Sequence, residues 1–346
     1  MTTMPLLQID NLSVTMMPPG AAPVPILSDV SLTLDKGATL GIVGESGSGK
    51  SMLSLAIMGL LPPTARAAGT IALNGRQLLT LPESAWCRIR GRRIGMIFQE
   101  PMTALNPAMR IGDQIAEGII WHRGVARAVA RRAAIDLLDQ VRIPDAKRRA
   151  ASYPHEMSGG QRQRVGIAIA LALQPDLMIA DEPTTALDVT VQAEILDILD
   201  ELVRERGMAL IIISHDLGVI ARAAHRTIVM YAGTGMEAGP TVALLRDPRH
   251  PYTTGLLAAM PRRRPGVGSG PGSRLATIPG TVPGFADMPA GCRFAGRCAR
   301  QTGACREATP AWRLFGSDGG RGVRCLHAQL DAAEPDRPEP DRVMPL

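Results

Sequence analysis

The stretch GESGSGKS at residues 44–51 constrains the fold of this chain more than any other feature. It follows ATLGIV, an apolar run that suits a buried strand, and leads into SMLSLAIMGLL, in which apolar residues recur at helical spacing. A strand, a glycine-rich loop and a helix in that order match the pattern G-x-x-x-x-G-K-[ST], whose backbone amides surround phosphate groups. A chance glycine- and serine-rich turn is the alternative, and the flanking strand and helix argue against it. We therefore expect an α/β domain that binds a phosphate-bearing ligand at this loop.

Two side chains of the loop carry its expected chemistry. Lys50 supplies a positive charge for the β- and γ-phosphates of a nucleotide, and Ser51 supplies a hydroxyl group for Mg²⁺. The other residues contribute backbone amides and the space that the phosphates need. The predicted nucleotide-contacting residues of this stretch are Gly44, Glu45, Ser46, Gly47, Ser48, Gly49, Lys50, Ser51 and Met52.

Two acidic residues follow the apolar run LMIA and complete the expected site. Asp181 can join the ligands of Mg²⁺, and the carboxylate of Glu182 can polarise an attacking water molecule. The alternative is that both are ordinary acidic residues at the end of a strand. The phosphate loop upstream makes the catalytic interpretation the better one.

The second half of the domain indicates a parallel sheet. DLMIADE at 176–182 and MALIIISHD at 208–216 are short apolar runs, typical of central strands that are buried on both faces. The segment 189–207 between them has helical periodicity and ends at Gly207, a residue typical of a helix C-terminus. Its apolar stripe comprises Val191, Ile195, Ile198, Leu199 and Leu202. A strand–helix–strand unit of this kind predicts an α/β fold.

Composition narrows the class of protein. Of the 346 residues, 45% are hydrophobic but only 3% are aromatic, so the core must consist mainly of aliphatic side chains. The N-terminus lacks the pattern of a signal peptide, and no stretch approaches the roughly 18 uninterrupted apolar residues of a membrane span, so we expect a cytosolic protein. The net charge of +6 comes from scattered arginines with few aromatic neighbours, which favours a solvated surface over a nucleic-acid or anionic-membrane partner.

The sequence SGGQRQR at 158–164 places two glycines a few residues before VGIAIALALQ, a helix-forming run. Two adjacent glycines are costly in an ordered chain because each loses much conformational freedom on folding. A bare, polar helix N-terminus is well suited to an anion, because its amides are unpaired and the helix dipole is positive there. We therefore expect Ser158, Gly159 and Gly160 to meet a ligand.

Six motifs together, in chain order, resemble those of the ATP-binding subunits of ABC transporters. They are GESGSGKS, Gln99 within MIFQEP, SGGQ, IADEP at 179–183, ALD at 186–188 and His215 within ISHD. The resemblance covers roughly residues 5–260 and implies a P-loop NTPase (RecA-like) core with an antiparallel β subdomain and a helical signature subdomain at about 100–165. We therefore predict a nucleotide-binding domain at 1–260, followed by a C-terminal extension at 261–330.

The resemblance implies a role for the SGGQ segment. In this family two nucleotide-binding domains pack head to tail around two ATP molecules, and SGGQ of one subunit meets the γ-phosphate bound to the other. The implied contacts in trans are Ser158, Gly159, Gly160 and Gln161. Asp188 is implied to lie at the same subunit interface.

The resemblance also implies a catalytic set. Glu182 is the general base, His215 contacts the γ-phosphate, and Gln99 senses Mg²⁺ and the attacking water. The implied Mg²⁺ ligands are Ser51, Gln99 and Asp181. The expected ligands of the chain are thus ATP and Mg²⁺.

Two positions depart from the family pattern. Met16, with Met17 beside it, stands where the family usually has an aromatic residue that stacks on adenine. A thioether packs on a base less well than an aromatic ring does, so we expect an effect on ATP affinity or base selectivity. Met157 precedes SGGQ where leucine is common, and this exchange is nearly isosteric.

Further motifs narrow the resemblance to the branch that energises dipeptide and oligopeptide uptake. They are FQEPMTALNP at 98–107, DEPTTALDVTVQAEI at 181–195, HPYTTGLL at 250–257 and TIPG at 277–280. An importer subunit for nickel, glutathione or another small solute is the first alternative. The second is a non-transport ABC ATPase that acts on DNA or the ribosome, which the single cassette and the lack of sustained heptads disfavour.

The branch implies the partners and the location. The chain pairs with a second ATPase subunit, either a paralogue or a second copy, and both dock on two membrane permease subunits. An extracytoplasmic solute-binding protein is an indirect partner, and no nucleic acid is expected. The implied location is the cytoplasmic face of the membrane, as a peripheral subunit.

Four cysteines cluster near the C-terminus with the spacing C-x5-C-x6-C-x19-C. They are Cys292, Cys298, Cys305 and Cys325. Disulfides are not expected in a reducing cytosol, which leaves a [4Fe–4S] cluster, a zinc site or four free thiols. The resemblance favours the cluster, because some members of the branch carry one there. His327 is a competing ligand, and Cys87 is expected to be an inert thiol.

Arginines surround these cysteines, and two interpretations stay open for them. They could offset the negative charge of a thiolate-bound cluster, or they could be solvated. They are Arg293, Arg297, Arg300, Arg306 and Arg324. By composition, 261–273 is a flexible linker or loop, and 331–346, rich in proline and charge, is expected to be disordered.

Overall fold

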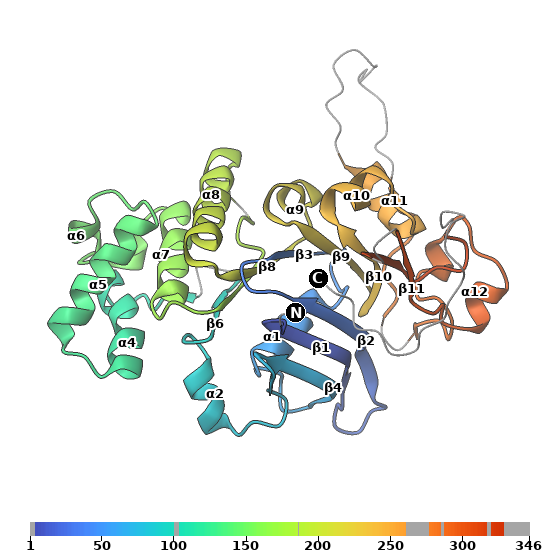
Figure 1. The fold of residues 1–346 in the computed structure, drawn as a ribbon, viewed down its shortest axis with the longest axis horizontal. Helices are drawn as coiled ribbons and strands as arrows, with labels where there is room; N and C mark the ends of the chain where they lie inside the picture. The colour runs from blue at the N-terminus through green and yellow to red at the C-terminus, as the bar shows by residue number, and fades with distance from the viewer. Residues whose placement is uncertain are drawn as a thin grey trace, which may run out of the picture.

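A computed structural model of the chain describes residues 4–99, 104–185, 187–260, 277–284, 287–316 and 320–328. The predicted linker at 261–273 and the predicted disordered tail at 331–346 lie outside these ranges, as does Ala186 of the ALD motif. Figure 1 shows two sheets in the middle of the molecule, with a group of helices at one end and the C-terminal segment at the other.

The larger sheet has a parallel centre. Its order is β11 (Arg313–Phe315), β12 (Arg321–Val323), β10 (Thr234–Pro240), β9 (Arg226–Tyr231), β3 (Thr39–Val43), β8 (Ala209–Ser214), β7 (Leu177–Asp181) and β6 (Ile94–Ile97). The strands from β9 to β6 run parallel, and β10, β12 and β11 continue the sheet antiparallel. The strands that we predicted at 176–182 and 208–216 are confirmed as neighbours, β7 and β8.

The smaller sheet is antiparallel and comes from the N-terminal part of the chain. Its order is β2 (Val24–Leu34), β1 (Leu7–Met16), β4 (Ala65–Leu73) and β5 (Arg76–Gln77). Asn74 and Gly75, with φ of 49° and 74°, make the two-residue turn between β4 and β5, as hairpins of this type require. This sheet is the antiparallel β subdomain that the resemblance implied.

Helices connect the strands and cover the larger sheet. The helices are α1 (Lys50–Ile57), α2 (Glu83–Ile89), α4 (Ile111–Arg123), α5 (Arg127–Gln140), α6 (Ala146–Arg149), α7 (Gly159–Leu171), α8 (Val189–Arg206), α9 (Leu217–Ala223), α10 (Thr241–Arg246), α11 (Pro251–Ala259) and α12 (Ala304–Glu307). Helices α4 to α7 gather at the left of Figure 1 and form the expected helical subdomain. Helix α8 ends at Gly207, whose φ of 59° confirms the predicted C-terminus. Within the described ranges, none of the helices combines the length and the apolar composition that crossing a bilayer requires.

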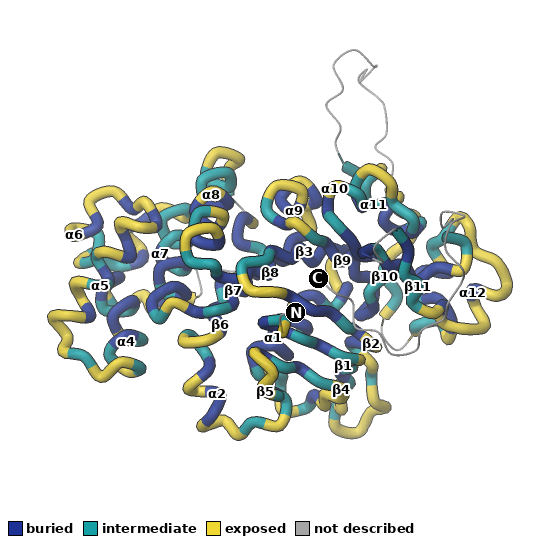
Figure 2. Tube along the Cα trace, in the orientation of Figure 1, coloured by how far each residue is buried: buried dark blue, intermediate teal, exposed yellow. Residues whose placement is uncertain are grey.

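The core lies on both faces of the larger sheet. Met178 and Ala180 of β7 belong to the apolar cluster that includes α7 and α8, whereas Leu177 and Ile179 belong to the cluster shared with the smaller sheet. This alternation follows from the period of two in a strand. Figure 2 shows these strands buried, as a parallel sheet covered on both faces requires.

The C-terminal segment is continuous with the larger sheet. β12 pairs with β10, so that Val323 lies opposite Glu237. The carboxylate of Glu237 is fully buried and accepts hydrogen bonds of 2.9 Å from the amides of Arg249 and His250. Arg321 of β12 lies 3.3 Å from the same carboxylate. The extension thus shares hydrogen bonds and a buried ion pair with the domain that precedes it.

The turn between β9 and β10 gives the first testable prediction. Ala232 and Gly233 have φ of 46° and 81°, and a Cβ atom at Gly233 would lie 1.8 Å from the carbonyl oxygen of Ile26. Gly233→Ala is therefore expected to lower the free energy of unfolding by about 2 kcal/mol or more. Denaturation in urea measures this loss.

A second glycine provides the matched control. Gly166 lies inside α7, and no heavy atom lies within 4 Å of a Cβ built on it. Gly166→Ala is expected to raise the free energy of unfolding by up to about 1 kcal/mol, because alanine favours the helix. Equal urea midpoints for the two variants would contradict the close approach at Gly233.

Candidate functional site

The glycine-rich loop lies between β3 and α1, where the sequence predicted it. All five residues of β3 are buried, and α1 begins at Lys50. A Cβ atom at Gly44 would lie 2.1 Å from the carbonyl oxygen of Met230, and Gly49 adopts a φ of 93°. Within the described chain, no acceptor binds the amides of Ser46 and Gly47. The loop thus needs its glycines and keeps amide donors available for an anion.

The side chain of Lys50 bridges three residues of this loop. Its Nζ donates hydrogen bonds to the carbonyl oxygens of Gly44 at 2.7 Å and Glu45 at 3.0 Å, and to Ser48 Oγ at 3.2 Å. Burial lowers the pKa of Lys50, although nearby carboxylates oppose this shift. A buried ammonium group is weakly hydrated, so its charge acts strongly on a phosphate placed beside it.

Asp181 ends β7 next to the loop. Its side chain is buried, and burial raises its pKa while a hydrogen bond with Ser51 opposes the shift. No residue in the described ranges gives Asp181 Oδ1 a hydrogen-bond partner. A buried carboxylate oxygen without a partner, close to a serine hydroxyl, fits a hard cation such as Mg²⁺. The two predicted ligands Ser51 and Asp181 therefore lie together.

Gln99 lies past the end of β6, at the edge of a described range. β6 and β7 are adjacent and parallel, so Gln99 and Asp181 come from the same edge of the sheet. The side chain of Gln99 is exposed. Its contact with Mg²⁺ stays a prediction.

Glu182 and His215 meet at the carboxyl ends of β7 and β8. Glu182 Oε2 lies 2.7 Å from His215 Nδ1 and accepts a hydrogen bond of 2.6 Å from Thr185 Oγ1. Glu182 has a φ of 51°, a conformation that costs energy outside glycine, asparagine and aspartate. The strained backbone and two side-chain contacts fix a carboxylate at the end of the sheet, beside Asp181.

SGGQ forms the N-terminus of α7, as predicted. Ser158 Oγ accepts from the amide of Gln161 at 3.3 Å, and the Gln161 side chain accepts from the amide of Ser158 at 3.2 Å, which makes a capping box. A Cβ atom at Gly160 would lie 2.7 Å from Val191 Cγ1 of α8. Gly159 is exposed. The motif thus packs against the start of α8 and leaves its polar end at the surface.

Asp188 lies beside this motif. It caps α8, since its Oδ1 accepts a hydrogen bond of 2.9 Å from the amide of Val191. Among the described residues, no hydrogen bond or ion pair joins 158–161 to 44–51. The structure therefore brings together two groups, the loop with Asp181 and Glu182, and SGGQ with Asp188.

Met16 and Met17, at the predicted adenine-stacking position, lie at the end of β1 and directly after it. Met16 ends β1 and packs, partly buried, against the core that the two sheets share. Met17 is 43% exposed, so it presents more of its side chain to a ligand than Met16 does. The effect of these residues on nucleotide affinity stays a prediction.

The four C-terminal cysteines lie near one another. Burial raises the pKa of Cys292 to about 11, and charge repulsion from the other three thiols adds to the shift. The amide of Cys292 donates a hydrogen bond of 2.7 Å to the carbonyl oxygen of Cys305. In the described part of the chain, however, no three His, Cys, Asp or Glu side chains are arranged so that they could hold a metal ion. The donor types suit a metal, but their arrangement here does not.

Three of the surrounding arginines are paired, so for them the solvated interpretation is wrong. Arg297 lies 2.6 Å from Glu45 of the phosphate loop, and Arg324 lies 2.7 Å from Asp29. Arg293 donates to the carbonyl oxygen of Ala232 and to Ser28 Oγ. Sequence analysis missed these contacts, because their partners lie more than 60 residues away along the chain.

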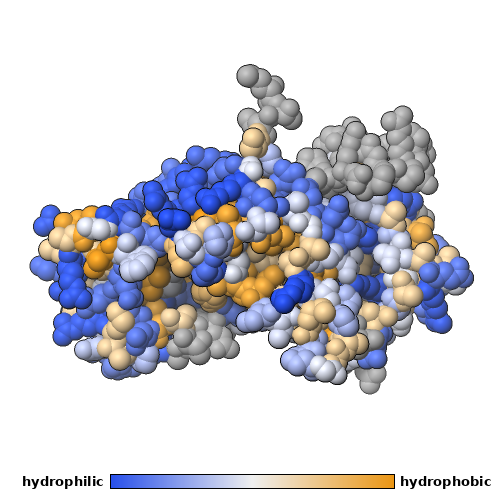
Figure 3. Space-filling view, turned by 90° about the horizontal axis from the view of Figure 1, so that it is seen from below, coloured by the Kyte–Doolittle hydropathy of each residue, from blue (hydrophilic) through white to orange (hydrophobic). Residues whose placement is uncertain are grey.

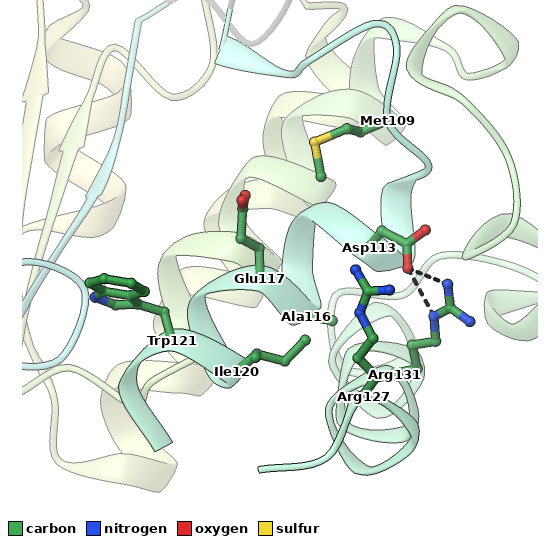
Figure 4. Close-up of a pocket in the computed structure, with 8 residues that line it drawn as sticks. All are labelled: Met109, Asp113, Ala116, Glu117, Ile120, Trp121, Arg127 and Arg131. Atoms are coloured by element: carbon green, nitrogen blue, oxygen red, sulfur yellow. Dashed lines mark hydrogen bonds and ion pairs between the residues drawn. The ribbon is translucent and has the colours of Figure 1, made fainter. Parts of the chain in front are cut away.

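A surface pocket lies in the helical subdomain, outside the phosphate loop. On the face in Figure 3, apolar side chains gather along the middle and hydrophilic ones surround them. A pocket of about 230 Å³ lies between α4 and α5, where Arg131 pairs with Asp113 at 2.8 Å and Trp121 is 78% exposed (Figure 4). Its residues belong to none of the motifs above.

Comparison with known proteins agrees with the motifs. The family described as ABC transporter matches residues 27–185, and the family described as oligopeptide/dipeptide transporter, C-terminal region, matches residues 236–305. The chain is 49% identical to a Brucella melitensis protein named as a peptide import ATP-binding protein, over 96% of this chain and 100% of that one. It is 48% identical to the oligopeptide transport ATP-binding protein OppD of Salmonella typhimurium, over 88% of this chain and 89% of that one.

A solved structure shows the same core. The dimeric ATP-binding cassette MJ0796, in a post-hydrolysis state bound to ADP and Pi, has a TM-score of 0.61 and 29% identity, over 68% of this chain and 98% of that one. The P-loop NTPase fold is therefore confirmed. By its fold, its motifs and its relatives, the chain belongs to the ATP-binding proteins of ABC transporters, in the branch of the peptide import ATP-binding proteins.

Proposed function

We propose that this chain binds ATP with Mg²⁺ and hydrolyses it to energise the import of peptides. The observation that carries the proposal is the convergence of three groups at one edge of the larger sheet. Lys50 bridges the residues of a glycine-rich loop, Asp181 presents an oxygen that has no partner among the described residues, and Glu182 is held beside it. The names of the relatives, which are peptide import and oligopeptide transport proteins, support the cargo class.

Different residues of the site have different roles in the proposed hydrolysis. Lys50 and the loop amides bind the phosphates, and Ser51, Asp181 and Gln99 would hold Mg²⁺. When bound, the ion neutralises charge on the β- and γ-phosphates. Glu182 orients the attacking water and accepts its proton, so that the water oxygen attacks the γ-phosphorus and ADP leaves.

His215 has a separate role in this scheme. It donates through Nδ1 to the Glu182 carboxylate, and in the doubly protonated imidazolium form its Nε2–H can also donate to an oxygen of the γ-phosphate. The contact also restricts the orientation of the carboxylate. We assign His215 to positioning both groups.

We further propose that two cassettes act as a head-to-tail dimer, with a paralogue or a second copy as the partner. The exposed ends of Ser158 and Gly159 and the exposed cap Asp188 support this arrangement. So does the lack of contacts between SGGQ and the phosphate loop among the described residues. The related cassette MJ0796 was solved as a dimer.

The proposed setting is the cytoplasmic face of the membrane. There the dimer docks on two permease subunits, and an extracytoplasmic binding protein delivers the peptide. Nickel, glutathione or another small solute is the alternative cargo. A non-transport ABC ATPase is the more remote one, and the match to the oligopeptide/dipeptide transporter C-terminal family disfavours it.

Uptake of labelled peptides tests the proposed cargo. Cells that lack this chain are expected to lose uptake of dipeptides, tripeptides or longer peptides, and the wild-type chain is expected to restore it. Glu182→Gln serves as the matched control, because it removes the proposed base and is expected to restore nothing. Unchanged peptide uptake in the deletion strain would contradict the peptide assignment and direct the assay to nickel and glutathione.

The four cysteines remain a separate proposal. Four thiols are a donor set that binds a [4Fe–4S] cluster or zinc. We propose the cluster on the basis of the family resemblance alone. The arrangement of the thiols described above does not support it, and no step of the reaction is routed through it. Iron, sulfide and zinc analysis of anaerobically purified protein distinguishes a cluster, a zinc site and free thiols.

A further inference from the structure

A segment of the C-terminal extension contacts the phosphate loop. It runs from Cys292 to Cys298 and includes Arg297, which is paired with Glu45. We propose that Arg297 is a positioning residue for nucleotide binding: it neutralises Glu45 and holds this carboxylate away from the bound phosphates. The proposal rests on the proposed function, because it assumes that the loop binds ATP.

Arg297 is fixed on several sides. Its Nη1 lies 2.6 Å from one carboxylate oxygen of Glu45, and its Nη2 lies 3.1 Å from the other, so the pair is bidentate. Its Nε donates to the carbonyl oxygen of Pro279 at 2.7 Å, and its guanidinium lies over the ring of Tyr231. The side chain is 7% exposed. A bidentate pair with so little solvent is directional and weakly screened.

Glu45 is an unfavourable residue in a phosphate loop unless its charge is compensated. It follows Gly44 directly, and its carbonyl oxygen accepts a hydrogen bond from Lys50 Nζ at 3.0 Å. Its negative charge reaches the same ammonium group, whose pKa it tends to raise. An uncompensated carboxylate on the residue next to Gly44 would repel a bound triphosphate, because Coulomb repulsion between nearby charges stays substantial at an effective dielectric constant of about 20. Arg297 cancels the charge and turns the side chain toward the extension.

The backbone of Glu45 is also linked to the C-terminal extension, through Tyr252. Its amide donates a hydrogen bond of 2.9 Å to the hydroxyl of Tyr252 on α11. Tyr252 packs against Phe294 of the extension, with ring centroids 5.2 Å apart. The first residues of the loop thus rest on the extension, while the amides that follow remain available for phosphate.

Other contacts anchor the extension without Arg297. Arg293 donates to the carbonyl oxygen of Ala232, and the next residue, Gly233, donates from its amide to the carbonyl oxygen of Ser48 at 2.9 Å. Phe294 is buried and lies 5.2 Å from Tyr231 between ring centroids. Removal of the Arg297 side chain is therefore expected to leave the segment in place.

The test compares Arg297→Ala with wild type in the full chain. Affinity for ATP with Mg²⁺ is measured by titration with a fluorescent ATP analogue, and KM and kcat by steady-state hydrolysis. Arg297→Ala is expected to weaken ATP binding about tenfold through uncompensated charge, with less effect at high salt. The value of kcat at saturating ATP is expected to change by less than about twofold, since the base and its partners are untouched.

A second substitution separates charge compensation from a merely structural role. Adding Glu45→Gln to Arg297→Ala removes the uncompensated carboxylate and is expected to restore the affinity. Arg297→Gln removes the charge but keeps amide donors for the carbonyl oxygens, and it is expected to reproduce the tenfold loss even if the alanine variant folds poorly. Arg300→Ala is the matched control, because Arg300 is an exposed arginine two residues beyond this segment, and wild-type affinity is expected.

The outcomes are distinct. Wild-type affinity in both Arg297 variants would overturn the proposal, and so would a double variant that binds ATP as weakly as Arg297→Ala alone. Failure of the wild-type chain to bind ATP at all would instead refute the proposed function.

Discussion

Lys50→Ala is expected to abolish ATP binding, with an affinity at least about 100-fold below wild type, or about 2.7 kcal/mol. The substitution removes the positive charge that we assign to the phosphates of the nucleotide. It also removes the donor that joins Gly44, Glu45 and Ser48 across the loop. Both effects act on the same site, because the ammonium group is buried within the loop that it shapes. Equilibrium titration with nucleotide measures the loss.

Lys36→Ala is the matched control for this prediction. Lys36 is exposed in the turn that leads into β3, so its removal takes one positive charge from the chain without touching the loop. Wild-type affinity is expected. If Lys50→Ala bound ATP as tightly as Lys36→Ala does, the assignment of the phosphate loop would be wrong.

Much of the site could be predicted from sequence, because the signals are local. A four-residue apolar run followed by Asp181 and Glu182 indicates both the strand β7 and the proposed catalytic site at its carboxyl end, and each property follows from a few consecutive residues. The same holds for the loop at 44–51 and for the capping box at Ser158. Since parallel strands align their carboxyl ends, neighbouring strands bring these short signals together.

The contacts between the extension and the loop could not be predicted in the same way. Arg297 and Glu45 are 252 residues apart, and Arg293 and Ser28 are 265 residues apart. Pairing at such a distance depends on how β10 and β12 place the extension on the sheet, which no local periodicity encodes. An arginine near a cysteine motif looks the same in sequence whether it is solvated, balances a metal site or holds a loop.

The spacing of the four cysteines was ambiguous for a related reason. Thiols are ligands for iron–sulfur clusters and zinc alike, and buried free thiols are also common. Spacing alone does not fix how the sulfur atoms point. Their closeness in the structure follows from the fold of the extension, in which the amide of Cys292 binds the carbonyl oxygen of Cys305.

Glu182→Gln is expected to reduce hydrolysis about 1000-fold while ATP binding stays within about threefold of wild type. The glutamine has the size of glutamate but does not accept a proton at neutral pH. Lys50, Ser51 and Asp181 are unchanged, so the phosphates and Mg²⁺ keep their ligands. A chain that binds ATP without hydrolysing it should accumulate as the closed dimer, which size-exclusion chromatography with ATP detects.

Glu205→Gln provides the control for charge alone, because Glu205 is exposed near the end of α8, away from the sheet edge. It is expected to hydrolyse ATP at the wild-type rate and to show no excess of dimer. Undiminished hydrolysis by Glu182→Gln would mean that another group accepts the proton of the water. Reduced binding together with reduced hydrolysis would instead mean that Glu182 supports the nucleotide itself. Only loss of turnover with retained ATP and a trapped dimer fits a carboxylate that His215 and Thr185 hold for the attacking water.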